Sequence, residues 1–260
     1  RRIKNWQALK FYINSGGMIL LTYIENFIKY KSVLNELIIR DIKTRYRRSV
    51  MGVLWSLLNP LCQMIVLSIM FSNIFKSDIE NFPLYILSGQ VIFNFFSEST
   101  NNAMSAIIDN TSLIKKTYIP KYLFVLSRIM SSAVNLLASF AALIVVMLLT
   151  RTEFHIAVLL SFLPMLLIVL FTIGVGLILA AYVVKFRDIA HLYGILVTTI
   201  LYLTPIIYPM SMISGIVKKI VWLNPLTNIV IMFRNLALNG ILPGVFSILL
   251  ACVECVVVIL

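Results

Sequence analysis

The stretch Ile156–Val184, IAVLLSFLPMLLIVLFTIGVGLILAAYVV, decides the fold because its 29 residues include no charged side chain. A helix needs roughly 20 apolar residues to cross the hydrocarbon layer of a bilayer, where every backbone polar group must be paired inside the helix. Of the 260 residues, 60% are hydrophobic and 12% are charged. This composition predicts a helical membrane protein and excludes a soluble globular domain.

Further apolar stretches predict an all-α polytopic membrane protein with six transmembrane helices. The expected spans are about 52–75, 83–108, 123–149, 156–184, 189–208 and 245–260. Between the last two, segment 210–240 holds two apolar runs too short to span, so we expect re-entrant helices in the outer leaflet. Residues 1–51 form a cytoplasmic and interfacial region, and residues 52–260 form the transmembrane domain. The last span is short and the chain lacks an initial Met, so we expect the natural protein to extend beyond both ends.

The formal net charge of +12 is best interpreted as membrane topology rather than as nucleic-acid binding. Of the 22 Lys and Arg residues, 17 fall before the first span or in the second and fourth connections between spans. Positive residues concentrate on the cytoplasmic side of membrane proteins. We therefore predict that both termini are cytoplasmic.

The segment 31–48 predicts an amphipathic helix parallel to the membrane surface. Its apolar residues recur at helical spacing, and its charged residues occupy the opposite face. One interpretation is an anchor on anionic lipid, and the other is a surface that contacts a cytoplasmic partner.

Six consecutive polar residues, Ser97–Asn102, interrupt the second span at membrane depth. Such groups avoid lipid, so they face either other helices or a hydrated path. Aromatic residues precede this run, including Tyr85, Phe93 and Phe96, and rings beside hydroxyls and amides suit a sugar. Both interpretations of the run remain open.

No catalytic, metal-binding or cofactor site is expected on this chain. The sequence has no phosphate-binding loop of the Gly-x-x-x-x-Gly-Lys-Ser/Thr type and no evident nucleophile set. We expect the three cysteines, Cys62, Cys252 and Cys255, to be inert membrane thiols. An acidic pair, Asp78 and Glu80, leaves a membrane lipid-sugar glycosyltransferase as an alternative.

The chain resembles the permease subunits of type-two ABC exporters, which move lipid-linked polysaccharides such as O-antigen and wall teichoic acid. The motifs that carry this resemblance occur in order along nearly the whole chain. They are IRDIKTRYRRSVMGVLW at 39–55, NP at 59–60, LIKKTYIP at 113–120, FRDI at 186–189, LTPIIYP at 203–209 and NPLT at 224–227.

The resemblance implies a homodimer of permeases with two ATP-binding cassette subunits in a bacterial inner membrane. ATP and Mg would be bound by those partners, and the substrate would be an undecaprenyl-linked polysaccharide of O-antigen, teichoic acid or capsule type. A permease for a small drug or lipid is the alternative within the same class.

The resemblance also implies roles for individual residues. The interface helix would contact the ATPase through Arg40, Asp41, Lys43, Arg45 and Tyr46. A coupling helix at 109–120 would do so through Leu113, Ile114, Lys115, Lys116, Tyr118 and Pro120. The re-entrant segment would gate the outer exit. Candidates for lining the channel are Phe71, Tyr85, Phe93, Phe96, Glu98, Asn101, Tyr202 and Tyr208.

Overall fold

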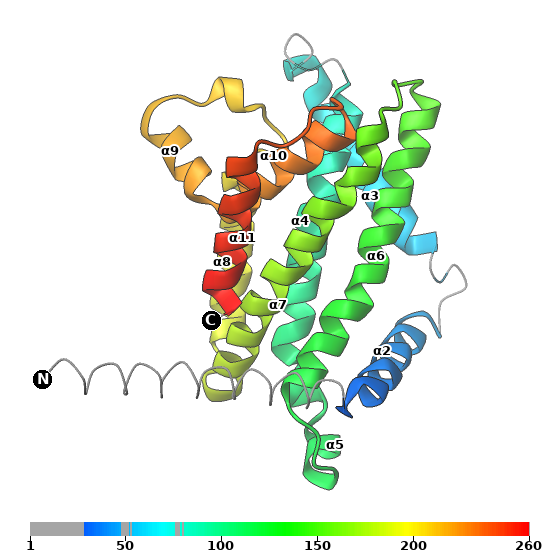
Figure 1. Cartoon of the computed structure of the whole chain (residues 1–260), viewed down its shortest axis with the longest axis vertical. Helices are drawn as coiled ribbons and strands as arrows, with labels where there is room; N and C mark the ends of the chain where they lie inside the picture. Colours follow the sequence, from blue (N-terminus) through cyan, green and yellow to red (C-terminus); the bar gives the residue numbers. More distant parts are fainter. Residues whose placement is uncertain (1–28, 48–51, 53, 76–78, 80, 260) are drawn as a thin grey trace, which may run out of the picture.

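A computed structural model of the chain describes residues 29–47, 52, 54–75, 79 and 81–259. This part of the chain is built from helices and contains no strand. A bundle along the long axis (Figure 1) is formed by α3 (Leu54–Phe75), α4 (Phe82–Asp109), α6 (Tyr122–Leu149), α7 (Phe162–Lys185), α8 (Ile189–Leu203) and α11 (Val245–Ile259).

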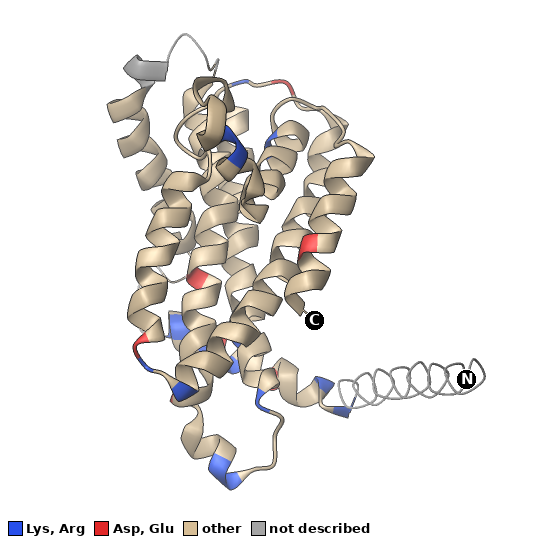
Figure 2. Cartoon of the chain, turned by 90° about the vertical axis from the view of Figure 1, so that its left-hand side faces the viewer, with Lys and Arg blue, Asp and Glu red and all other residues tan. Residues whose placement is uncertain are grey.

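Shorter helices lie at the two ends of the bundle (Figure 1). The end that carries α2 (Lys31–Tyr46) and α5 (Thr111–Lys116) is called the inner end, and the end that carries α9 (Gly215–Leu223) and α10 (Pro225–Ala237) is called the outer end. Two 3-10 helices, η1 (Ile156–Ser161) and η2 (Met210–Met212), precede α7 and α9. Lys and Arg residues are concentrated mainly around the inner end (Figure 2).

Three helical segments among the described residues are long and apolar enough to cross a membrane, namely Leu54–Phe71, Tyr122–Leu149 and Ile156–Lys185. The number rises to four if α9 and α10, which meet at an angle of 86°, count as one broken span. Helix α4 has the length, but its polar middle leaves it short of the required hydropathy, and α8 and α11 are shorter apolar helices. The six predicted spans are therefore all helical, whereas six crossings remain a prediction.

Helix α4 is the centre of the bundle because it packs against α3, α6, α7, α8 and α10. Its buried side chains point to several sides, and the large ones, such as Ile92, Phe95 and Phe96, belong to the main apolar core. Close approach to α7 depends on Gly176, where a Cβ atom would lie 3.0 Å from that of Ala103 on α4. Small residues allow helix backbones to approach in this way.

Prolines and extended residues set several helix ends earlier than the apolar pattern predicts. The predicted span 189–208 ends as a helix at Leu203, because Thr204 precedes Pro205 and adopts an extended conformation. The predicted coupling helix 109–120 is limited to Thr111–Lys116, because Thr117 is extended. The predicted span 156–184 starts as a 3-10 helix and becomes α-helical at Phe162. The predicted interface helix 31–48 ends at Tyr46, and Arg47 lies in a turn. Arg48 lies outside the described residues.

Candidate functional site

A network of polar side chains joins α2 to three helices of the bundle near the inner end. We call this set the inner polar network; its members are Arg45, Tyr46, Ser56, Glu98, Asn102, Ser132 and Asn135. These residues come from α2, α3, α4 and α6, so the network connects the surface helix to the bundle interior.

The ion pair between Arg45 and Glu98 is the centre of the inner polar network. Arg45 Nη1 lies 2.5 Å from Glu98 Oε1, and Arg45 Nη2 donates to Ser132 Oγ at 3.3 Å. The amide of Asn135 donates to both Glu98 oxygens, at 2.8 and 2.9 Å. Tyr46 donates its hydroxyl proton to Asn135 Oδ1 at 2.6 Å. The Glu98 carboxylate is therefore held by donors from two helices, which fixes α2 against α4 and α6.

A second contact between α2 and α6 is made by Asp41, whose side chain is only 4% exposed. Its carboxylate accepts from Ser127 Oγ at 2.9 Å and from Arg40 Nη2 at 2.8 Å, and Arg128 Nε lies 3.9 Å away. A buried carboxylate needs such partners because desolvation otherwise disfavours its charge.

These contacts divide the predicted interface residues into two groups. Asp41, Arg45 and Tyr46 point toward the bundle, whereas Lys43 is exposed and Arg40 is partly exposed. Only the second group presents charge to the surroundings of the bundle in this conformation. The role of the five residues in ATPase contact stays a prediction.

Two of the six residues in the polar run of α4 join this helix to α6. Glu98 and Asn102 bond to side chains of α6, and Thr100 bonds back to the carbonyl of Phe96 at 2.7 Å. Asn101 is exposed and donates to the carbonyl of Ser97 at 2.7 Å. Of the two interpretations of the run, contact between helices fits Glu98 and Asn102, and Asn101 remains the candidate for a hydrated surface.

The predicted coupling residues lie on and just after α5, which protrudes from the inner end of the bundle (Figure 1). Lys115 and Lys116 are exposed, and Tyr118 is 98% exposed. Leu113 and Ile114 are half-buried against the bundle, and Pro120 is also half-buried. The segment thus presents two cations and an aromatic ring to its surroundings, and its coupling role stays a prediction.

At the outer end, Arg234 of α10 is buried with no carboxylate partner among the described residues. It donates to the carbonyls of Tyr85 and Ile206, both at 3.0 Å, to the carbonyl of Pro205, and to Ser88 Oγ at 3.2 Å. The guanidinium carbon also lies 3.6 Å from the centroid of the Tyr85 ring. We call Arg234 and these four partners the outer arginine cluster. It joins α10 to α4 and to the loop after α8.

Gly89 makes space for the outer arginine cluster on α4. A Cβ atom at this position would lie 2.6 Å from Arg234 Nη2 and 3.0 Å from Ile206 Cγ2. The absence of a side chain therefore lets both the guanidinium and the loop after α8 approach the helix.

Two of the motifs that carry the family resemblance contact each other beside this cluster. Asn224 Nδ2 donates to Thr204 Oγ1 at 2.9 Å, and Asn224 Oδ1 accepts from the backbone of Leu226 at 3.1 Å. Asn224 thus caps α10 and also holds it to the end of α8.

The predicted channel-lining residues separate into distinct environments. Tyr85 donates to the carbonyl of Tyr208 at 2.9 Å, and Tyr208 donates to the carbonyl of exposed Tyr202 at 2.7 Å. Phe71 and Tyr208 pack against a small apolar cluster at the outer end. Phe93 and Phe96 instead belong to the core, so neither ring faces open space in this structure. Their channel role stays a prediction that this burial does not support.

The remaining chemical features of the sequence give no additional site. Asp78 and Glu80, the acidic pair behind the glycosyltransferase alternative, lie outside the described residues. Within the part of the chain that the structure describes, no group of three His, Cys, Asp or Glu side chains could hold a metal ion. Cys255 is buried, and Cys62 and Cys252 are exposed on apolar helices.

Sequence comparison places this arrangement in a class of membrane transport proteins. Residues 33–238 match the family described as ABC-2 type transporter, and the chain belongs to that family. The O-antigen export system permease protein RfbA of Klebsiella pneumoniae is 29% identical over 205 residues, which cover 78% of this chain and 79% of that protein.

Other relatives extend the comparison across most of the sequence. The protein of the same name from Myxococcus xanthus is 28% identical over 226 residues, 86% of this chain and 87% of its own. The polysialic acid transport protein KpsM of Escherichia coli is 24% identical over 223 residues, 84% of each chain. The inner polar network, α5 and the outer arginine cluster all fall inside the matched family region.

Proposed function

We propose that the chain is the membrane-spanning subunit of an ATP-driven exporter that moves an undecaprenyl-linked polysaccharide across the inner membrane of a bacterium. The observation that carries this proposal is family membership together with relatives, named for O-antigen and polysialic acid transport, that match most of the chain. An O-antigen or capsule-type polymer fits these names best, and a wall teichoic acid rests on the sequence resemblance alone.

The proposed assembly contains two copies of this chain and two ATP-binding cassette subunits, which bind ATP and Mg. Both termini of each copy lie in the cytoplasm and six helices cross the membrane, which places α2 and α5 on the ATPase side. This orientation is supported by the basic residues that gather around the inner end (Figure 2).

The contacts of α2 suggest how motion of the ATPase subunits reaches the membrane. Displacement of α2 acts on α4 and α6 through the Arg45–Glu98 pair and the Asp41–Ser127 hydrogen bond. Helix α4 continues to the outer end, where Tyr85 and Ser88 contact Arg234 of α10. Packed helices with polar contacts at both ends can transmit such displacements.

The test uses the complex of this chain with its candidate ATPase subunit, reconstituted in lipid, and compares the wild type with Lys115→Glu/Lys116→Glu. The wild type is expected to hydrolyse ATP and to export polymer in cells. The double variant reverses two exposed charges on α5 and is expected to lose export while the chain remains folded. The matched control is Lys218→Glu/Lys219→Glu on α9, which changes charge equally at the outer end and should leave ATPase binding intact.

Failure of any ATPase subunit to copurify with the wild-type chain would refute the proposal. Transport of a small lipid or drug without loss of surface polymer in a deletion strain would favour the alternative permease. Loss of polymer synthesis rather than export in Asp78→Ala/Glu80→Ala would favour the glycosyltransferase.

A further inference from the structure

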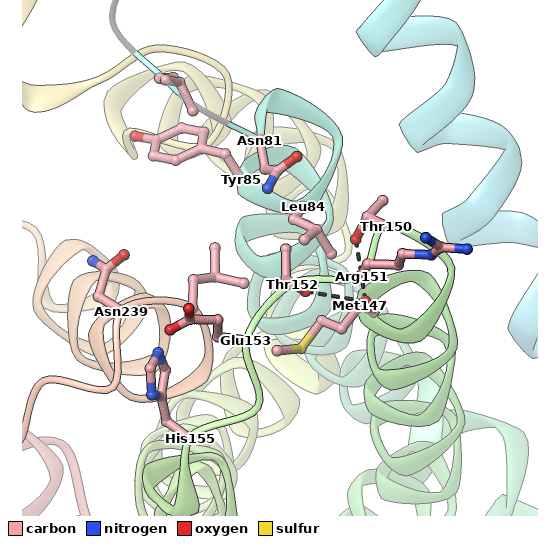
Figure 3. Close-up of a pocket in the computed structure, with 12 residues that line it drawn as sticks. Asn81, Leu84, Tyr85, Met147, Thr150, Arg151, Thr152, Glu153, His155 and Asn239 are labelled. Atoms are coloured by element: carbon pink, nitrogen blue, oxygen red, sulfur yellow. Dashed lines mark hydrogen bonds between the residues drawn. The ribbon is translucent and has the colours of Figure 1, made fainter.

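A cavity of about 620 Å³ opens at the outer end of the molecule, beside the outer arginine cluster (Figure 3). Asn81 and Tyr85 at the start of α4 form one side of it (Figure 3). Glu153 and His155 from the loop after α6, with Asn239 after α10, form the other side. The volume falls within the range of roughly 300–1,000 Å³ that is typical of ligand pockets.

The cavity wall combines hydrogen-bond donors, acceptors and charges of both signs. The side chains of Asn81, Glu153 and His155 reach the cavity and are at least partly exposed, so their polar atoms are available to a ligand. Asn239 Nδ2 donates to Asn235 Oδ1 at 3.2 Å, so a ligand would use mainly the carbonyl oxygen of Asn239. The carboxylate of Glu153 accepts, and the amides of Asn81 and Asn239 both donate and accept. Arg151 and Glu153 contribute opposite charges, so the wall does not select an anion or a cation by net charge.

The loop that forms one wall is held in place by local contacts. Thr152 bonds to the carbonyl of Met147 through its backbone at 3.2 Å and through its hydroxyl at 3.1 Å. Arg151 adopts a positive φ of 52°, which is uncommon for a residue with a side chain. Gly240, with φ of 65°, packs against His155 so closely that a Cβ atom there would lie 2.7 Å from the imidazole ring. The loop therefore ends α6 in the left-handed conformation that is common after a helix, and it keeps Glu153 and His155 at the cavity wall.

We propose that this cavity is a binding site for saccharide units of the polymer. The proposal rests on the proposed function for the identity of the ligand. A sugar presents hydroxyl groups that donate and accept at once, which matches amides and a carboxylate placed around one space. The partly exposed apolar side chains of Ile79 and Leu238 in the same wall suit the apolar faces of sugar rings.

The site is connected to the outer arginine cluster by Tyr85 and by the end of α10. Tyr85 lines the cavity and also receives the Arg234 guanidinium over its ring. Leu238 and Asn239 line the cavity directly after the helix that carries Arg234. A saccharide that contacts both walls therefore bridges α4 and the segment after α10, and it favours the conformation in which the cluster is intact.

The experiment measures binding of a lipid-free oligosaccharide, released by mild acid from the surface polymer of the producing cells, to the purified full chain with its ATPase partner. Saturation-transfer NMR gives the affinity and the sugar protons in contact. The variant Glu153→Ala/Asn239→Ala is compared with Ser211→Ala, an exposed polar residue at the same end that does not line the cavity. We expect the double variant to bind the oligosaccharide at least about tenfold more weakly than the wild type, because it loses two hydrogen bonds.

The conservative variant Glu153→Gln keeps an acceptor and is expected to bind more tightly than Glu153→Ala, which separates a ligand contact from a folding defect. Equal affinity in wild type and the double variant, or no binding of the oligosaccharide to the wild type, would overturn the inference. If the wild-type chain exports polymer although it does not bind the oligosaccharide in this cavity, the proposed function stands without this site. Whatever the result of the binding test, a strain that lacks this chain should lose export of the polymer. Continued export in that strain would overturn the proposed function itself.

Discussion

Removal of the Arg234 donors should loosen the outer end of the molecule while the rest of the bundle stays intact. Arg234→Met keeps most of the apolar volume of the side chain but deletes every hydrogen bond that Arg234 makes to α4 and to the loop after α8. The carbonyl of Tyr85 retains the Ser88 hydroxyl at 2.8 Å, and the carbonyl of Pro205 retains only a long contact of 3.4 Å from the Tyr85 hydroxyl. The carbonyl of Ile206 has no other partner among the described residues.

Two acceptors are therefore left poorly satisfied, at about 1–1.5 kcal/mol each. Removal of an unpaired buried charge relieves part of its desolvation cost, which acts in the opposite direction. We expect a net loss of about 2 kcal/mol in the local stability of the contact between α10 and α4. That loss corresponds to a factor of about 30 in the opening equilibrium.

Hydrogen–deuterium exchange of the protein in nanodiscs measures this opening directly. Amides in 206–208 and in 228–237 should exchange about 30-fold faster, while those of α6 keep their wild-type rates. Arg234→Lys should give an intermediate effect, because an ammonium cannot reproduce the planar fork of donors. Arg151→Met, which removes an exposed arginine at the same end, is the matched control. Exchange within threefold of wild type in Arg234→Met would refute the assignment of α10 attachment to this cluster.

Three further substitutions test neighbouring contacts. Gly89→Ala should accelerate exchange at the outer end although Ala favours helices, because its Cβ would lie 2.6 Å from Arg234 Nη2; unchanged or slower exchange would contradict this. Arg45→Ala and Glu98→Ala should show a coupling energy of about 1 kcal/mol in a double-mutant cycle of thermal unfolding, because the pair is only partly buried; strict additivity would argue against it. Asn224→Ala should destabilise the start of α10 by about 1 kcal/mol, and Asn224→Asp, which keeps the capping oxygen, should recover most of that loss in exchange at Ile229.

The helices of the bundle could be predicted from the sequence because the controlling forces are local, although several of their ends differ from the prediction. Long apolar runs predict the helices of the bundle, and Pro205 explains why α8 ends at Leu203 instead of the predicted position 208. The split between α9 and α10 follows from Asn224-Pro225, where an extended cap residue precedes a proline at the first helical position. The number of membrane crossings could not be settled in the same way, because it depends on the bilayer as well as on helix length.

The partners of the buried polar residues could not be predicted, because they lie far apart along the chain. Arg45 and Glu98 are separated by 53 positions, and Arg234 lies 149 positions from Tyr85. One signal was available for the inner polar network: Ser132 and Asn135 lie on one face of α6, at helical spacing from Arg128 and Ser139. A second was the lone Arg234 in the apolar run of α10, which the charge count treated only as a marker of topology.

The two polar groups of the bundle differ in a way that bears on how they could act. The inner polar network contains an ion pair in which the Glu98 side chain is 38% exposed, so water can replace its partners when α2 moves. The outer arginine cluster holds a cation on backbone carbonyls, and the Arg234 side chain is buried from solvent in this structure. Separation at the inner end therefore requires little free energy, whereas separation at the outer end requires something to replace the lost acceptors.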